Sequence, residues 1–176
     1  MSQYERIYQR AIDNYGVVTA DDAHRLGVHR KEMLNWTRMG RLVKCGRGVY
    51  RLTHYVPTEL DRYAEALALV GGDAMVFGDG VLALHNLALV NPPYVTVACS
   101  RRLRRALPEW IRVVKVPEGE RVDNFNGIAT QSVAAAIRFC RGAVMSDRLR
   151  DAVAEAERNG LVDSHEAESL RRDLAQ

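Results

Sequence analysis

Three short helical segments, each ended by a glycine, precede a strand–turn–strand pattern within the first 52 residues. Apolar residues recur at spacings of three and four between residues 4 and 15, which predicts an amphipathic helix that Gly16 ends. A short second helix is predicted over residues 20–26, with Gly27 at its left-handed end. This order of elements restricts the fold more strongly than any other part of the chain.

A third helix and a hairpin complete the pattern. Thr19 stands three residues before Asp22, a capping-box-like start for the second helix. The third helix is predicted over residues 29–39, where Gly40 ends it. The strands RLVKC and GVYRL then flank a Gly-Arg turn, which is the composition of a β-hairpin. Helix, helix, tight turn, helix and hairpin is the order of a winged helix-turn-helix, whose third helix can enter the major groove of DNA.

A helical-wheel count separates two faces of the third helix. At about 100° per residue, the residues predicted to face the core lie within about 60° of Met33 and are Trp36, Thr37 and Gly40. The opposite face carries Lys31, Asn35 and Arg38, with Arg30 and Leu34 at its margin. Two cations and an amide are therefore grouped where base edges and phosphates would lie.

Positive charge is concentrated in the same part of the chain. Residues 1–55 hold 10 Lys and Arg against 5 Asp and Glu, whereas residues 146–176 hold 5 against 8. The helical order, the hairpin and its cations together favour DNA binding over a merely solvated basic face. The candidate DNA contacts are His29, Arg30, Lys31, Asn35, Arg38, Arg41, Lys44 and Arg47. His29 is either the N-cap of the third helix or a phosphate contact.

Residues 56–176 are predicted to form a mixed α+β domain after a winged-helix domain at residues 1–55. The segment after residue 57 is predicted as a helix with Thr58 and Asp61 at its start. Its predicted buried stripe is Leu60, Ala64, Leu67 and Ala68. The other predicted elements are, in order, a strand AMVF, a helix GVLALHNLAL, strands YVTVAC and WIRVVKV, a hairpin around Asn126-Gly127, a helix SVAAAIRFC with Ser132 as its cap, and two helices opened by Ser146 and Ser164.

The stretch AMVFGDGVLA resembles a dinucleotide-binding fingerprint, with Gly78 and Gly80 between a short strand and a helix. Such a loop can bring backbone amides to a pyrophosphate. The same glycines are equally explained as turn residues, and the following strands lack the βαβ order of a full doubly wound sheet.

No catalytic or metal-binding pattern is present in the sequence. The five His residues lack metal-ligand spacing, and the three Cys residues lack a Cys-x-x-Cys pair. His85 is predicted to be a hydrogen-bonded core residue. We therefore expect neither an enzyme nor a bound cofactor or metal.

A second basic cluster follows the strand YVTVAC and comprises Arg101, Arg102, Arg104 and Arg105. It could extend a DNA footprint along the phosphate backbone, where each neutralised phosphate strengthens binding. It could equally meet an acidic protein surface, or be a solvated loop. The residues do not choose between these three interpretations.

The hydropathy of the chain predicts a soluble cytoplasmic protein without membrane contact. No apolar run approaches the roughly 18 residues of a membrane span. The first ten residues carry charges where a signal peptide needs its apolar region.

Residues 16–52, which end in Gly-Arg-Gly-Val-Tyr-Arg-Leu, resemble the winged-helix module that opens AbiEi-family antitoxins. The resemblance continues more loosely over residues 82–105 and 126–139. It implies a bacterial repressor that binds inverted repeats in its own promoter and counters a nucleotidyltransferase-type toxin encoded beside it. It assigns toxin neutralisation to the second domain. The FGDG stretch departs from the polar Ser or His run of many relatives. A stand-alone winged-helix regulator that senses a small ligand is therefore the alternative, and a purely structural interaction module is a third class.

Overall fold

The computed structural model describes residues 1–175, and the chain divides into two units, Met1–Gly71 and Gly72–Gln176. The first unit extends beyond the domain boundary predicted at residue 55, because helix α4 (Asp61–Val70) packs against the N-terminal sheet. The sequence showed a linker at residues 53–57, but the contacts of the following helix return the chain to the first unit.

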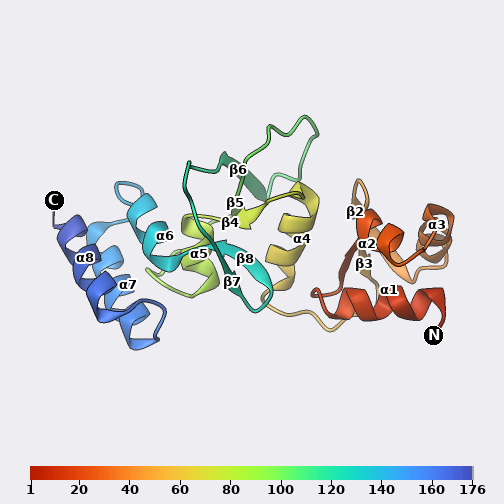
Figure 1. Ribbon diagram of the computed structural model, residues 1–176, viewed down its shortest axis with the longest axis horizontal. Helices are drawn as coiled ribbons and strands as arrows, with labels where there is room; N and C mark the ends of the chain where they lie inside the picture. Colours follow the sequence, from red (N-terminus) through yellow and green to blue (C-terminus); the bar gives the residue numbers. More distant parts are fainter. Residues whose placement is uncertain (176) are drawn as a thin grey trace. The chain divides into compact units, whose positions relative to one another are not determined.

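The N-terminal unit is a winged helix-turn-helix followed by α4 (Figure 1). Its other elements are α1 (Gln3–Ile12), β1 (Val17–Thr19), α2 (Ala20–Arg25), α3 (Arg30–Arg38), β2 (Leu42–Gly46) and β3 (Val49–Leu52). The three strands form an antiparallel sheet in the order β1-β3-β2. Strand β1 was not predicted, and it joins the segment before α2 to the hairpin that forms the wing.

The core of this unit lies between the three helices and the sheet. Its buried residues are Ile7, Ala11, Val18, Ala23, Val28, Met33, Trp36, Leu42, Tyr50 and Leu52. Only Ile7 and Ala11 of α1 are fully covered, whereas Tyr8 and Ile12, which were predicted on the same stripe, are 41% and 37% exposed. The apolar stripe of α1 is therefore wider than the part of the helix that packs against the core.

Helix α4 buries a different face from the one predicted. Ala64 is buried as expected, but Leu67 and Ala68 are only partly covered, and the others that are buried are Ala66, Leu69 and Val70. A Cβ atom added to Gly46 of β2 would clash with a methyl group of Leu69, so the helix approaches the wing strand at a residue that lacks a side chain. An alanine-rich helix shows little contrast between its faces, so the sheet that it packs against decides which face is buried.

The second unit is built on a five-stranded mixed sheet with the strand order β6-β5-β4-β8-β7. Its strands are β4 (Met75–Val76), β5 (Val95–Cys99), β6 (Ile111–Lys115), β7 (Val122–Phe125) and β8 (Ile128–Gln131). Its helices are α5 (Asp79–Leu84), α6 (Val133–Phe139), α7 (Ser146–Arg158) and α8 (Ser164–Leu174). The pairs β5–β6 and β4–β8 are parallel, and the pairs β4–β5 and β7–β8 are antiparallel. The predicted α+β fold class is confirmed.

The predicted hairpin turn and one predicted helix cap of this unit are confirmed, and the caps predicted for the last two helices are wrong. Asn126 and Gly127 both have positive φ between β7 and β8, as the predicted hairpin turn requires. Ser132 caps α6 by accepting a hydrogen bond from the amide of Ala135. The cap of α8 is Asp163 rather than the neighbouring serine, and the N-cap of α7 is Met145.

Helix α5 is shorter than predicted. The apolar pattern continues to residue 90, but the helix ends at Leu84, and Asn86, Ala88 and Leu89 all have positive φ. Each of these left-handed residues costs roughly 1–2 kcal/mol. The apolar residues that suggested one long helix therefore belong to a helix and an irregular segment.

Candidate nucleic-acid interface

The inner face of α3 fixes this helix to the N-terminal unit. Met33 and Trp36 are buried, and the Trp36 ring packs edge-on against Tyr4 of α1 with 5.2 Å between ring centroids. The Thr37 hydroxyl donates to the Met33 carbonyl at 2.8 Å. Gly40, predicted on the buried stripe, is instead exposed in a left-handed turn just after the helix. The position at residue 40 serves chain reversal rather than packing.

The outer face of α3 carries Lys31, Asn35 and Arg38 at spacings of four and three. Lys31 and Arg38 are exposed, and Asn35 is partly exposed. Neither cation has an ion-pair partner among residues 1–175. Residues three and four apart lie on one helix face, so the three side chains form one strip. This strip keeps its hydrogen-bond donors available to a ligand.

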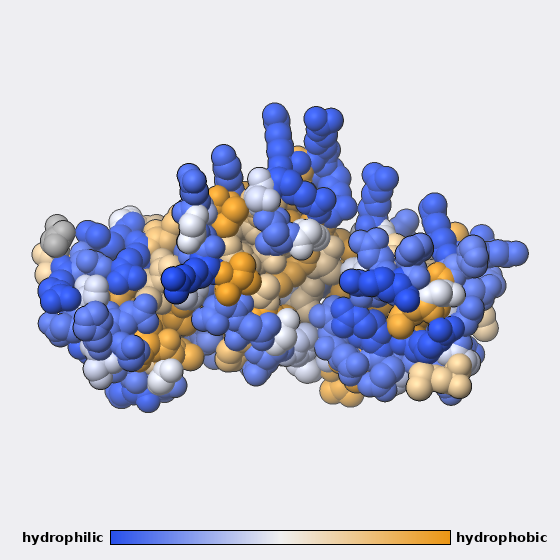
Figure 2. Space-filling view, in the orientation of Figure 1, coloured by the Kyte–Doolittle hydropathy of each residue, from blue (hydrophilic) through white to orange (hydrophobic). Residues whose placement is uncertain are grey.

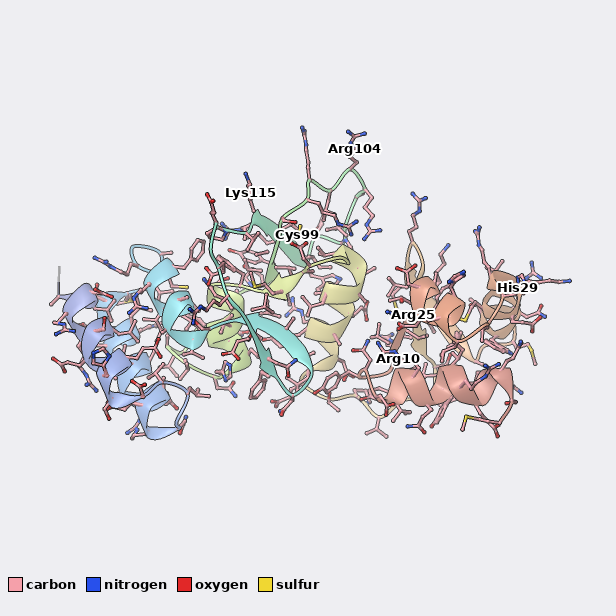
Figure 3. All side chains as sticks on the ribbon, viewed as in Figure 1. Arg10, Arg25, His29, Cys99, Arg104 and Lys115 are labelled. Atoms are coloured by element: carbon pink, nitrogen blue, oxygen red, sulfur yellow. The ribbon has the colours of Figure 1, made fainter. Side chains whose placement is uncertain are left out.

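The first turn of α3 carries two cations and the carboxylate of Glu32, and it lacks a side-chain cap. His29 occupies the N-cap position, but its side chain makes no capping hydrogen bond. Its ring is exposed and extends from the start of the helix (Figure 3). Arg30 and Lys31 follow in the first turn, where the helix dipole disfavours cations by about 0.3–1 kcal/mol. His29 is therefore the N-cap residue of α3 by position, although its side chain does not cap the helix, and the phosphate contact stays a prediction. A phosphate at this helix end would be favoured by the backbone amides and by both cations.

The wing carries cations of two kinds. Lys44 and Arg47 are exposed and have no ion-pair partner in the described part of the chain. Arg51 contacts Glu65 of α4 at 3.4 Å, and the guanidinium of Arg41 lies 4.8 Å from the centre of the Tyr4 ring. Arg51 and Arg41 thus hold elements of the unit together. Lys44 and Arg47 have no such structural role.

A buried carboxylate binds two further arginines of the same unit. Asp22 of α2 accepts hydrogen bonds from Arg10 of α1 at 2.8 Å and from Arg25 of α2 at 2.9 Å. Figure 3 labels the two arginines. It also accepts from the amide and the hydroxyl of Thr19, which completes the predicted capping box. Burial alone would raise the pKa of Asp22, but the hydrogen bonds from Thr19 and Arg10 outweigh burial and hold the pKa below its usual value. Charge in this unit is therefore divided between structural ion pairs and an unpaired outer strip.

The second basic cluster lies in the connection between β5 and β6. Arg101, Arg102 and Arg104 are exposed, whereas Arg105 is partly buried. Lys115 at the end of β6 and Arg104 both extend away from the sheet (Figure 3). Figure 2 shows long hydrophilic side chains standing out from the surface over β6 and this connection. The second unit thus has its own basic surface.

The glycine loop before α5 is filled by the protein itself. The Gly78 amide donates to Oε1 of Gln131 at 3.0 Å, and a Cβ atom on Gly78 would lie 2.8 Å from the ring of Phe139. A Cβ atom on Gly80 would lie 3.0 Å from the carbonyl oxygen of Thr96. Both glycines therefore have packing roles. This geometry favours the turn interpretation over dinucleotide binding, because the amide that a pyrophosphate would need is already bonded.

Potential metal ligands are scattered among the described residues. Within residues 1–175, no group of three or more His, Cys, Asp or Glu residues could hold a metal ion. His85 is half-buried and stacks edge-on against Phe125, with 4.5 Å between ring centroids, and burial lowers its pKa. No helix among these residues is long and apolar enough to cross a membrane.

One known protein family matches part of the N-terminal unit. Residues 5–53 match the family described as transcriptional regulator, AbiEi antitoxin. Residues 5–53 of the N-terminal unit are thus similar to AbiEi-type regulators. The predicted resemblance is thereby confirmed for this unit, and it supports a DNA-binding antitoxin from a family of regulators rather than of enzymes.

The fold of the whole chain has a structural relative. The chain is similar to the crystal structure of the RV2827C protein from Mycobacterium tuberculosis, with a TM-score of 0.54 and 14% sequence identity. The similarity covers 96% of this chain and 70% of that chain. A search of curated proteins found no match. The match to the AbiEi antitoxin family over residues 5–53 therefore carries the functional comparison, and the structural relative supports the fold alone.

Proposed function

We propose that this protein is a cytoplasmic DNA-binding repressor that binds inverted repeats in its own promoter. The observation that carries the proposal is the unpaired strip of Lys31, Asn35 and Arg38 on α3. The strip lies outside the core of an AbiEi-type winged helix and is followed by the unpaired wing cations Lys44 and Arg47. In such folds the third helix reads base edges and the wing contacts phosphates.

Removing Lys31 and Arg38 together tests whether α3 is the recognition helix. The double variant Lys31→Ala with Arg38→Ala should weaken binding to the promoter fragment at least about tenfold, since each base contact contributes about 1–3 kcal/mol. The matched control is Arg158→Ala with Arg172→Ala, which removes the same charge from α7 and α8. Fluorescence anisotropy with the promoter fragment and with a scrambled duplex measures both variants. Equal binding by the two double variants would overturn the assignment of α3.

The wing should contribute to DNA affinity without recognising the base sequence. Arg47→Ala should weaken binding to promoter and scrambled DNA by the same factor. It should also reduce the slope of log affinity against log salt by about one unit. A loss confined to the promoter fragment would instead mean that Arg47 reads bases.

The same protein acts as the antitoxin against a nucleotidyltransferase-type toxin encoded beside it. The family of the winged helix supports this second role, and toxin neutralisation is assigned to residues 72–176. Co-expression with the neighbouring nucleotidyltransferase should restore growth of the host. The Lys31→Ala, Arg38→Ala variant should still restore it when transcription is driven from an unrelated promoter. Failure of the wild-type chain to restore growth would remove the antitoxin role and leave the repressor role to be judged by DNA binding.

A further inference from the structure

A cavity of about 490 Å³ lies beside the first turn of α3 in the N-terminal unit. Its apolar wall is formed by Ala20, Ala23, Val28, Met33 and Tyr50, which come from α2, the following turn, α3 and β3. Figure 2 shows apolar surface among hydrophilic side chains over α2 and α3. Small-molecule sites typically have volumes of about 300–1,000 Å³ and mostly apolar walls, so this cavity has the dimensions of such a site.

The polar lining of the cavity consists of nitrogen donors. His24, His29 and Arg30 line it and are all exposed. Within residues 1–175 none of these three side chains is engaged in a hydrogen bond or ion pair, and no Asp or Glu lines the cavity. The backbone amides of the first turn of α3 also lack a side-chain cap. An apolar wall with donors and positive charge along one side is complementary to an organic anion.

We propose that this cavity binds a small anion with an apolar body, of the aromatic carboxylate class, and that this ligand and DNA exclude each other. The ring would cover the apolar wall, and the carboxylate would accept hydrogen bonds at the start of α3. Exclusion follows because His29 and Arg30 line the cavity and are also candidate DNA contacts. This regulatory step rests on the proposed DNA-binding function, whereas binding of the anion itself does not.

Binding is tested on the full chain with matched acids and amides. Indole-3-acetate, salicylate and benzoate are titrated by calorimetry and in thermal unfolding, beside indole-3-acetamide, salicylamide and benzamide. At least one acid should bind saturably and raise Tm. Its amide should bind at least about tenfold more weakly, because a charge-assisted hydrogen bond is lost. Absence of acid binding up to millimolar concentration, or equal binding of acid and amide, would overturn the proposal.

Two variants locate the site. Ala20→Leu adds a bulky group at an exposed position of the cavity wall, and Ala154→Leu makes the same change at an exposed position of α7. The first should abolish acid binding and the second should leave it unchanged. Acid binding that survives Ala20→Leu would place the ligand elsewhere and refute the assignment.

Competition with DNA separates this inference from the proposed function. The acid that binds should weaken promoter binding by wild-type protein in proportion to its occupancy. His24→Ala should bind DNA normally, because His24 is outside the candidate DNA contacts, and should need at least about tenfold more acid for the same effect. Acid binding without any DNA binding would refute the repressor and keep the cavity assignment. DNA binding unaffected by a saturating acid would refute the exclusion.

Discussion

Asp22 joins α1 to α2 through a partly buried ion pair with Arg10. It is 3% exposed and is bonded to Arg10, Arg25 and Thr19. Asp22→Asn should lower the free energy of unfolding by about 2 kcal/mol near neutral pH, because hydrogen bonds to a charged group are lost. The backbone shape would be kept, since asparagine has the same size.

The pH dependence of this loss identifies its origin. Because the folded pKa of Asp22 lies below the ordinary value, its contribution is complete above about pH 4 and is lost as pH falls through the folded pKa. Urea unfolding of wild type and Asp22→Asn should therefore differ at neutral pH and converge in acid. A difference that stays constant at all pH values would point to altered packing instead.

His29 offers a separate test in which stability and function should move in opposite directions. Glu32 already stands at the third position of α3, so His29→Ser would create a capping box and raise the free energy of unfolding by about 1 kcal/mol. DNA affinity should fall, because the phosphate contact is removed. Urea unfolding and anisotropy measure the two effects.

Met145 provides the matched control, because it is also an N-cap without a capping hydrogen bond. Met145→Ser should stabilise α7 without changing DNA affinity. If His29→Ser raises both stability and DNA affinity, His29 is not a DNA contact.

The caps at Thr19 and Ser132 were predictable from the sequence, whereas the caps of α7 and α8 and most side-chain partners were not. The Thr19–Asp22 capping box lies within four residues, so it leaves a local signal. The contact of Asp22 with Arg10 spans 12 residues, and that of Arg51 with Glu65 spans 14. The sequence therefore located the cations of the candidate interface. Only the structure separated those that hold the unit together from those that are unpaired.

At the scale of elements, the loop before α5 resembles a ligand-binding motif, but its glycines pack against other parts of the protein. Gly78 has φ 54° and ψ −124°, a conformation that is open to glycine and unfavourable for alanine. Gly78→Ala should therefore lower the free energy of unfolding by about 1–3 kcal/mol for the backbone alone. A further loss of about 1–3 kcal/mol is expected because the new methyl group would clash with Phe139. Urea unfolding measures the total loss.

Gly127→Ala measures the cost of a positive φ without a clash. Gly127 also has positive φ, but nothing lies within 4 Å of its added Cβ atom. It should therefore lose only about 1 kcal/mol. Equal losses in the two variants would mean that Phe139 moves away freely and that the loop is less tightly packed than inferred.

Elements with strong local signals were predicted, and short or context-dependent ones were not. The helix-turn-helix and the Asn-Gly hairpin have caps and turns close in sequence. Strand β1 has only three residues, too few for an alternating pattern, and is defined by pairing with β3. The end of α5 was missed because an apolar pattern continued through left-handed residues.

At the scale of the whole molecule, positive charge is present on both units although their totals differ. Residues 1–71 carry 11 Lys and Arg against 8 Asp and Glu, whereas residues 72–176 carry 14 of each. The cluster of Arg101, Arg102, Arg104 and Arg105 is therefore local to a neutral unit. Composition could locate this cluster but could not show which members are exposed, because that depends on how the β5–β6 connection folds.

We predict that the exposed part of this cluster adds phosphate contacts to the DNA footprint. Arg102→Ala with Arg104→Ala should weaken binding to promoter and to scrambled DNA equally. The slope of log affinity against log salt should fall by about two units, since each neutralised phosphate contributes about 0.9. Arg158→Ala with Arg172→Ala removes the same charge elsewhere in the unit and should change the slope little. Anisotropy titrations over a range of salt concentrations measure both slopes.

Equal slopes in the two double variants would contradict a DNA role for Arg102 and Arg104. An acidic protein surface or a solvated loop would then remain as interpretations of this basic connection, and co-expression with the toxin distinguishes the two. Loss of growth rescue by Arg102→Ala with Arg104→Ala, with DNA affinity unchanged, would assign the cluster to toxin neutralisation. Reduced salt slope with rescue intact would assign it to DNA, because a contact with phosphates releases counterions and a contact with the toxin does not alter DNA binding.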